Sequence, residues 1–337
     1  MAMTRRRFIA RSATTPLLGT LGLAGRIGAA LAAEASGERG PPMPDLPITR
    51  LSPHVTMIFS PDGFPTPENH GMMANILFIE GDRGVVVVDT GASVEIGEMA
   101  VRQLKAATSK RVIGLFNTHF HGDHWLGNQA FLAAFGTDLP IYAHPDCRKA
   151  IAGATGIAWR DAMLRWTNAA SLGTTITPPT VDVGHGFTLP LGDVTLKVHH
   201  YGTAHTPCDL SIEVVGDGVT CVGDVMMDRR IANMEDGSYQ GTFEAIDKLV
   251  AATQTTIWAP AHGVPGPKVI DWQREIFQGI WESAVAAVKQ GIPLEDALAF
   301  TLKDPRVSGK AKDTKGFDRN IGKYVSLAYL EAEQSQF

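Results

Sequence analysis

The chain has 337 residues, of which 44% are hydrophobic and 19% are charged, and its formal net charge is −5. This length allows one large domain or two ordinary ones, and the composition excludes a disordered chain, which would be less apolar and more highly charged. Five arginines precede the first acidic residue, Glu34, so the remainder carries 25 basic against 35 acidic residues. Such an acidic protein is a poor candidate for binding nucleic acid or an anionic membrane surface.

The first 33 residues have the features of an export signal. The segment TRRRFI, at positions 4–9, resembles the twin-arginine export motif, and a mildly apolar stretch rich in Gly and Ala follows it. Small residues at positions 30–35 offer a cleavage site for signal peptidase. The alternative is a membrane-anchoring helix, but four glycines and Arg26 within the stretch disfavour a span of about 20 apolar residues. We therefore predict a twin-arginine signal over residues 1–33 and a periplasmic protein that leaves the membrane once the signal is removed.

Residues 34–50 are rich in Pro, Gly and Glu and are predicted to be a linker. The patterns that follow alternate between strands and helices. In chain order they predict strands over 55–60, 75–80 and 85–89, a helix over 94–108, a strand over 112–117, a helix over 125–135, a strand over 141–143, a helix over 145–152 and a helical insert over 157–172.

Strands return in the second half of the chain, and helices then continue to its end. The predicted elements are strands over 195–200, 210–215 and 219–222, a helix over 243–252, a strand over 257–259, and helices over 269–290, 294–302 and 318–333. Short strands mixed with crossover helices are typical of a layered α/β sandwich. We place the main domain at 51–267 and a C-terminal helical extension at 268–337.

The sequence Thr118-His119-Phe120-His121-Gly122-Asp123-His124 is the strongest chemical signal in the chain. Imidazole and carboxylate groups are the ligands that zinc prefers where thiolate is absent. His119 and His121 can face one metal, while Asp123 and His124 reach a second one. A solvated His-rich loop is the alternative, but only 11 of the 337 residues are histidines, so this clustering favours a metal site.

This motif resembles the His-x-His-x-Asp-His signature of the metallo-β-lactamase superfamily. Further segments resemble other superfamily motifs, in the expected order, and these are VVDTG at 87–91, TAHTP at 203–207, Gly223-Asp224, and PAHG at 260–263. The resemblance extends from about residue 55 to residue 266. It implies a four-layer αββα sandwich of the α/β (α+β) class that contains two Zn²⁺ ions.

The resemblance also implies the two ligand sets. His119, His121 and His205 would hold the first zinc ion, Asp123, His124 and His262 the second, and Asp224 would bridge both. It implies a hydrolase in which a metal-bridging hydroxide attacks an ester, thioester, lactone or related bond of a small-molecule substrate. Asp123 and Asp224 are the candidates for proton relay.

Several other residues are candidates for supporting roles. Asp89 could orient a ligand histidine or cap a turn, and Asp209 could play a similar role. His70 lies in a loop rich in Gly and Pro, where such enzymes often contact substrate. Trp159 and Trp166 favour packing over a substrate platform.

The cysteines Cys147, Cys208 and Cys221 favour buried, inert thiols, although no pairing can be read from the sequence. Some lactamases use a cysteine as a ligand of the second metal, but His124 and Asp224 make Cys221 redundant there. The bridging position of Asp224 favours hydrolases similar to glyoxalase II and lactonases over lactamases.

The whole-chain pattern is similar to exported zinc metallohydrolases of the quinoprotein-relay and Sox-type groups. Two alternatives remain, namely a β-lactamase and a non-hydrolytic diiron or sulfur-relay metalloprotein. Diiron members of the superfamily typically have a glutamate at the position of His121 and a flavin domain. The oligomeric state and the substrate cannot be read from the sequence.

Overall fold

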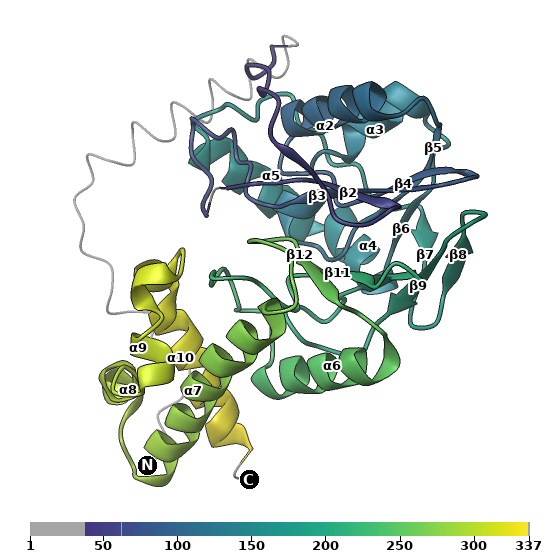
Figure 1. Ribbon diagram of the computed structural model, residues 1–337. Helices are drawn as coiled ribbons and strands as arrows, with labels where there is room; N and C mark the ends of the chain where they lie inside the picture. Colours follow the sequence, from purple (N-terminus) through teal and green to yellow (C-terminus); the bar gives the residue numbers. More distant parts are fainter. Residues whose placement is uncertain (1–37, 62, 336–337) are drawn as a thin grey trace. The chain divides into compact units, whose positions relative to one another are not determined.

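Two β-sheets lie face to face at the centre of the structure, a computed structural model that describes residues 38–61 and 63–335 (Figure 1). Both sheets belong to a unit that begins at Gly40. The predicted signal peptide lies outside the described residues. Within them, no helix combines the length and the apolar character needed to cross a membrane.

The first sheet has seven strands, which follow one another in sequence order. Its strands are antiparallel from β1 to β4 and parallel from β4 to β7. They are β1 (Ile48–Arg50), β2 (Val55–Ile58), β3 (Ile76–Gly81), β4 (Gly84–Val88), β5 (Val112–Phe116), β6 (Ile141–Ala143) and β7 (Val181–Asp182).

The second sheet has five strands in the order β12-β11-β10-β9-β8. Its strands are antiparallel except for the parallel pair of β11 and β12. They are β8 (Thr188–Pro190), β9 (Thr195–His199), β10 (Ser211–Val215), β11 (Val219–Gly223) and β12 (Ile257–Pro260).

Both faces of the first sheet are buried, and the strand sequences show why. In β3, Leu77 and Ile79 pack into the core between the sheets, together with Leu196 and Ile212 of the second sheet. Ile76 and Phe78 of the same strand join the core on the opposite face. Because successive side chains of a strand point to opposite faces, an uninterrupted apolar strand requires a layer on each side.

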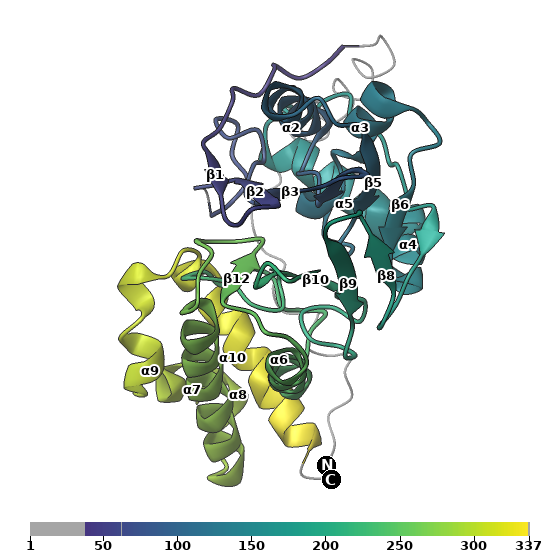
Figure 2. The same ribbon diagram turned by 45° about the vertical axis from the view of Figure 1, so that its right-hand side comes forward.

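Helices form the two outer layers (Figures 1 and 2). The outer face of the first sheet packs against side chains of α2 (Val94–Ala107), α3 (Asn128–Phe135), α4 (Pro145–Ala152) and α5 (Ala154–Trp166). The second sheet packs against α6 (Tyr239–Ala252) through Ile246 and Leu249. The predicted αββα sandwich is thereby confirmed.

The last part of the chain is helical, as expected, and has its own apolar core. Its helices are α7 (Val269–Lys289), α8 (Leu294–Thr301), α9 (Pro305–Ser308) and α10 (Phe317–Gln334). The Glu331 carboxylate of α10 accepts hydrogen bonds from Ser238 Oγ and from the backbone N–H groups of Tyr239 and Gln240, at 2.8–3.1 Å. A carboxylate at the start of a helix satisfies free N–H groups and complements the helix dipole, so this contact anchors α10 to α6.

Three helices begin or end away from their predicted positions, and one of them, α6, begins at Tyr239 instead of residue 243. The expected helix over 125–135 begins only at Asn128, after a 3-10 turn at Gly122–His124. The expected insert over 157–172 is α5, which begins at Ala154 and ends at Trp166. Asn168 and Ala169 have φ angles of 48° and 69°, which a right-handed helix cannot accommodate. The apolar spacing beyond Trp166 belongs to a compact turn.

Three short strands were not predicted, namely β1, β7 and β8. β1 lies within the predicted linker and pairs with β2, so the linker ends in ordered structure. β7 and β8 have two and three residues, which is too short for an alternating pattern to be recognised.

His54 connects three turns at one edge of the sandwich. Its Nδ1 lies 2.8 Å from Asp217 Oδ1, and its Nε2 lies 3.1 Å from Asp193 Oδ2. Asp217 also accepts a hydrogen bond from Ser52 Oγ. The hydrogen bond with Asp217 raises the pKa of His54, and the contact with Asp193 adds to this effect, although burial opposes both.

We expect His54→Gln to destabilise the protein more at pH 6 than at pH 9. Because the pKa of His54 is raised on folding, its contribution is complete below the unfolded value and is lost as pH rises through the folded value. At pH 6, His54→Gln should lower the free energy of unfolding by about 1 kcal/mol, a small value because the network is partly exposed. Denaturant unfolding at both pH values measures it, with His185→Gln as an exposed control. An equal or larger loss at pH 9 would contradict this role.

Candidate metal centre

Loops at the ends of the strands bring seven buried histidines and aspartates together. Four of them lie on the loop that follows β5, and they are His119, His121, Asp123 and His124. Each of the others follows a strand of the second sheet, with His205 after β9, Asp224 after β11 and His262 after β12. The cluster therefore forms between the two sheets.

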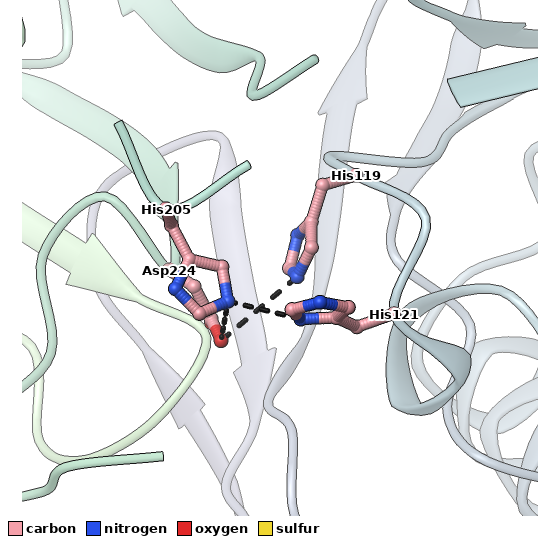
Figure 3. Close-up of side chains that lie close together, drawn as sticks. All are labelled: His119, His121, His205 and Asp224. Atoms are coloured by element: carbon pink, nitrogen blue, oxygen red, sulfur yellow. Dashed lines mark hydrogen bonds and ion pairs between the residues drawn. The ribbon is translucent and has the colours of Figure 1, made fainter. Parts of the chain in front are cut away.

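The side chains of His119, His121, His205 and Asp224 form the first group (Figure 3). His205 Nε2 lies 3.0 Å from His121 Nδ1 and 3.4 Å from Asp224 Oδ2. His119 Nε2 lies 3.9 Å from the same Asp224 oxygen. Three imidazoles and one carboxylate oxygen thus face a common point.

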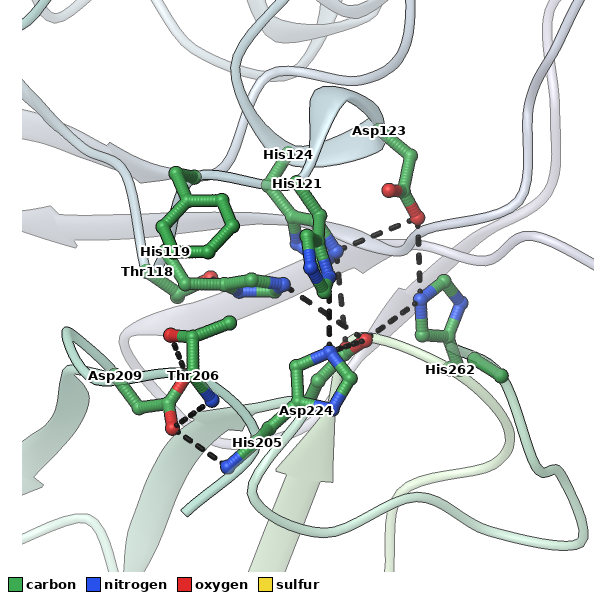
Figure 4. A network of polar contacts seen from close by, with 12 residues as sticks. Thr118, His119, His121, Asp123, His124, His205, Thr206, Asp209, Asp224 and His262 are labelled. Atoms are coloured by element: carbon green, nitrogen blue, oxygen red, sulfur yellow. Dashed lines mark hydrogen bonds and ion pairs between the residues drawn. The ribbon is translucent and has the colours of Figure 1, made fainter. Parts of the chain in front are cut away.

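Asp123, His124 and His262 form the second group (Figure 4). Asp123 Oδ2 lies 3.3 Å from His124 Nε2 and 3.2 Å from His262 Nε2. Asp224 also reaches this group, because it lies 3.2 Å from His262 Nε2 and 3.8 Å from His124 Nε2. Asp224 is therefore the side chain that the two groups share.

Several donor atoms of this cluster lack a hydrogen-bond partner within the protein, as expected for metal ligands. These buried atoms include Nε2 of His119, His124 and His262 and Oδ1 of Asp224. Unsatisfied buried polar atoms are costly, so such a concentration of them calls for a ligand. Nitrogen and oxygen donors without thiolate suit zinc and related divalent ions.

The pKa values of the clustered side chains bear on which of them can bind a metal ion. Burial lowers the pKa of His205 to about 3, which leaves its imidazole neutral and able to bind a metal. Burial alone would raise the pKa of Asp123, but the neighbouring His124 and His262 outweigh it and hold that pKa well below its usual range. A neutral His205 beside an ionised Asp123 has the protonation states that metal ligands require. Burial would lower the pKa of His124 and His262, but the neighbouring carboxylates outweigh it and raise the pKa of both, so these histidines would release a proton when a metal binds.

Asp89 contacts His124 of the second group through the imidazole nitrogen that does not face the cluster. Its Oδ2 lies 2.8 Å from His124 Nδ1 and accepts a hydrogen bond from Thr118 Oγ1, while its Oδ1 accepts one from the Thr118 backbone N–H. A carboxylate that accepts the Nδ1 proton of His124 leaves Nε2 free to face a metal. Asp89 therefore lies where a residue that orients a ligand histidine was expected.

Asp209 holds a loop instead of an imidazole. Its Oδ2 accepts hydrogen bonds from the backbone N–H groups of His205 and Thr206, each at 2.8 Å, and its Oδ1 accepts one from Thr206 Oγ1 at 2.6 Å. This arrangement fixes the turn that carries His205. Of the two roles considered, orienting a histidine or capping a turn, the contacts of Asp209 match the turn.

A cavity of about 1070 Å³ opens onto the cluster. His121, Asp123, Asp224 and His262 form part of its wall. Trp159 and Trp166 also line it, so the expectation that they only pack was incomplete. Trp159 does both, because it packs against the apolar core and its ring centroid lies 4.9 Å from that of His121.

His70 is not among the residues that line this cavity. It belongs to a turn in which Asn69 Oδ1 accepts hydrogen bonds from the N–H groups of Thr66 and Gly71, both at 2.8 Å. Its φ angle of 52° fits such a turn. The loop does reach the cavity, but it does so through Phe64, Pro65 and Thr66.

Two charged residues near the cluster were missed by the sequence analysis. Asp236 Oδ2 lies 3.1 Å from His121 Nε2, so it can orient that imidazole with Nδ1 toward the first group. Arg230 is only 5% exposed and lines the cavity beside Asp123 and Asp224. Both lie in an irregular segment after β11, where no periodic pattern marks a residue as part of the site.

Cys221 lies in the core between the two sheets, in strand β11. All three cysteines are free and buried, and burial raises the pKa of the Cys221 thiol. We expect Cys221→Ala to leave the metal content unchanged and to cost about 1 kcal/mol of stability from lost packing. Metal analysis of the purified variant tests this expectation. The loss of one ion from a folded variant would make Cys221 a ligand.

Comparison with known proteins agrees with this geometry. The model of the family described as "Metallo-beta-lactamase superfamily" matches residues 71–301, which is more than half of the chain. Two solved structures share the fold. A metallo-beta-lactamase from Pontibacter korlensis aligns with a TM-score of 0.56 and 19% identity over 69% of this chain and 99% of that chain. VMB-1 aligns with a TM-score of 0.50 and 14% identity over 69% and 96%.

A curated relative matches part of the sequence. The atrochrysone carboxyl ACP thioesterase of Aspergillus chevalieri is 28% identical over 104 residues, which are 30% of this chain. The matched region covers only 32% of that relative's length. The family match over residues 71–301, which agrees with the αββα fold and the buried histidine and aspartate cluster, shows that the chain belongs to the metallo-β-lactamase superfamily.

Proposed function

We propose that the chain is a dinuclear zinc hydrolase of small-molecule esters, thioesters or lactones. The observation that carries this proposal is the pair of ligand groups that share Asp224. His119, His121 and His205 would hold one ion, Asp123, His124 and His262 the other, and the Asp224 carboxylate would lie between them. When bound, two such ions lower the pKa of a shared water and stabilise negative charge on the substrate.

The residues of the chain have their own tasks in this reaction. Asp89 and Asp236 hold the imidazoles of His124 and His121 in the tautomers that free one nitrogen of each. The Arg230 guanidinium places a buried positive charge at the cavity wall beside Asp123 and Asp224. Such a charge favours a substrate group that gains negative charge as the bond breaks.

The proposed reaction is the hydrolysis of a thioester or ester. The oxygen of water bonds to the acyl carbon, the bond from that carbon to sulfur or oxygen breaks, and one proton of the water ends on the leaving group. The match to a thioesterase supports including thioesters, although it covers only 30% of this chain. The likeness to a metallo-beta-lactamase at 19% identity reflects the fold and does not by itself favour β-lactams.

Metal analysis and a substrate screen test the proposal. Metal-replete protein should contain close to two zinc ions per chain, and it should hydrolyse at least one member of a panel of thioesters, esters, lactones, phosphoesters, sulfate esters and β-lactams. Turnover of β-lactams alone would favour the lactamase alternative. Two iron ions with redox activity and no hydrolysis would favour the diiron alternative. A single bound ion would contradict the dinuclear site.

We also propose that the protein is exported to the periplasm by the twin-arginine route. The proposal rests on the TRRRFI segment, which lies outside the residues that the structure describes. Replacing Arg5 and Arg6 with lysine should block export, because a receptor reads the paired arginines and not their charge alone. Fractionation of cells that express the full chain measures the result. Normal export of the double variant would contradict the assignment.

A further inference from the structure

The cavity above the metal centre has an aromatic wall. Trp159 and Trp166 of α5 contribute to it, with ring centroids 6.0 Å apart, and Phe64 lies 5.6 Å from Trp166. Trp159 also contacts His121 of the cluster. The aromatic rings thus form a continuous row from the cluster outward. Such a surface binds the apolar or aromatic part of a small molecule.

Another part of the wall is positively charged and comes from the C-terminal helices. Lys315, Arg319 and Lys323 all line the cavity; Lys315 lies just before α10, and Arg319 and Lys323 lie within it, four residues apart. Side chains four residues apart lie on the same face of a helix. Arg165 of α5 and the buried Arg230 add two further cations to the lining.

Among the described residues of the lining, few carboxylates outside the metal cluster accompany Lys315 and Arg319. Glu235 is the carboxylate of the lining that lies outside the cluster, and it pairs with Lys323 at 2.6 Å. Among the described residues, Lys315 and Arg319 have no carboxylate within ion-pair distance. The chain as a whole carries a net charge of −5, so its average composition does not account for a cationic cavity.

The cationic segment is held in place by backbone contacts. The N–H of Lys315 donates to the carbonyl of Arg229 at 2.9 Å, and the N–H of Ile231 donates to the carbonyl of Lys315 at 3.1 Å. The Arg319 guanidinium lies 3.6 Å from the centre of the Phe64 ring. Because the backbone is bonded on both sides of Arg230, the backbone of Lys315 is fixed beside Arg230 at the cavity wall.

We infer that the cavity selects substrates that carry an anionic group as well as an apolar body. Lys315 and Arg319 would hold the anion, which can be a carboxylate, sulfate or phosphate, while Phe64, Trp159 and Trp166 contact the apolar body. The hydrolysable bond would then lie toward the metal cluster. This inference rests on the proposed hydrolase function for its role in turnover, but the binding preference itself does not depend on turnover.

A binding experiment with two matched probes tests the anion preference directly. Naphthalene-2-sulfonate and the neutral methyl 2-naphthyl sulfone have the same aromatic body and differ in charge. Isothermal titration calorimetry of zinc-replete protein should give about tenfold tighter binding of the sulfonate, as expected for charge-assisted contacts. The Lys315→Gln/Arg319→Gln variant should lose this preference and keep its affinity for the sulfone.

Two further variants separate local contacts from general effects. Lys289→Gln/Lys312→Gln removes the same charge from exposed positions outside the cavity lining, and it should bind both probes as the original protein does. Lys315→Arg/Arg319→Lys keeps the charge and should keep the preference. Equal binding of the two probes by the original protein, or an unchanged preference in Lys315→Gln/Arg319→Gln, would overturn the inference.

Turnover provides the second readout. Succinyl and butyryl thioesters of the same thiol differ only by a terminal carboxylate, and kcat/KM should be higher for the succinyl thioester by about the same factor as the binding preference. If neither thioester is hydrolysed while the protein still prefers the sulfonate, thioester hydrolysis is contradicted and the anion-binding site is supported. If both thioesters are hydrolysed at equal rates and the two probes bind equally, the anion-binding site is contradicted and the hydrolase function is supported.

Discussion

Asp224→Ala should remove most of the hydrolytic activity and weaken the binding of one metal ion. The Asp224 carboxylate is 4% exposed and lies within 3.9 Å of the imidazoles of His119, His205 and His262. A neutral imidazole brings no negative charge, so none of the histidines can offset the repulsion between two dications. We expect the loss of activity to reach at least about 100-fold, which corresponds to about 3 kcal/mol of transition-state stabilisation.

The metal content of Asp224→Ala should fall mainly at the second group. The first group keeps three histidines, whereas the second keeps two histidines and Asp123, and Asp224 lies 3.2 Å from His262 of that group. Zinc titration and hydrolysis assays measure both effects. His185→Ala is the control, because His185 is exposed and lies outside the cluster. Two tightly bound ions and near-normal turnover in Asp224→Ala would show that this aspartate is not the bridge.

Asp89→Asn is expected to weaken metal binding without changing any proposed ligand. Asn has nearly the same size as Asp and tolerates the φ angle of 58° at this position, so the backbone should be little affected. The amide NH₂ group would, however, face donors, because one Asp89 oxygen accepts from Thr118 Oγ1 and lies 2.8 Å from His124 Nδ1. Loss of such a supporting carboxylate typically lowers metal affinity by about 10- to 100-fold.

A competition assay with a zinc chelator measures the affinity of Asp89→Asn. Asp138→Asn makes the same chemical change at an exposed position outside the cluster and should have no effect. Because the weakened ion is the one beside His124, hydrolysis should recover in part at high zinc concentration. Unchanged affinity in a folded Asp89→Asn variant would mean that His124 is oriented by other contacts.

The sequence was sufficient to predict the fold and to bring the cluster together. Short strands mixed with crossover helices predicted a layered α/β sandwich, whereas its four-layer form and the two ligand sets were implied by the resemblance of the motifs to the superfamily. Asp89 could be predicted because its motif lies at a strand end. These parts of the structure depend on local patterns that survive in a single sequence.

The cavity wall could not be predicted in the same way. Asp236 and Arg230 lie in an irregular loop, and Lys315 reaches the site through a backbone pairing with residues 229–231 that has no sequence signature. The sequence favoured His70 as a substrate contact because its loop is rich in Gly and Pro, but that loop reaches the cavity at Phe64 instead. Contacts between segments far apart in sequence therefore account for most of what was missed.

The two sheets contribute the ligands jointly, and this arrangement links metal uptake to folding. His119 and His121 come from the loop after β5, while His205 and Asp224 come from loops of the second sheet, so neither half of the chain holds the first group alone (Figure 3). The full set of ligands exists only once the halves have assembled. The compartment where the chain folds therefore supplies the metals from which the site selects. For a protein exported already folded, as proposed here, that compartment would be the cytoplasm.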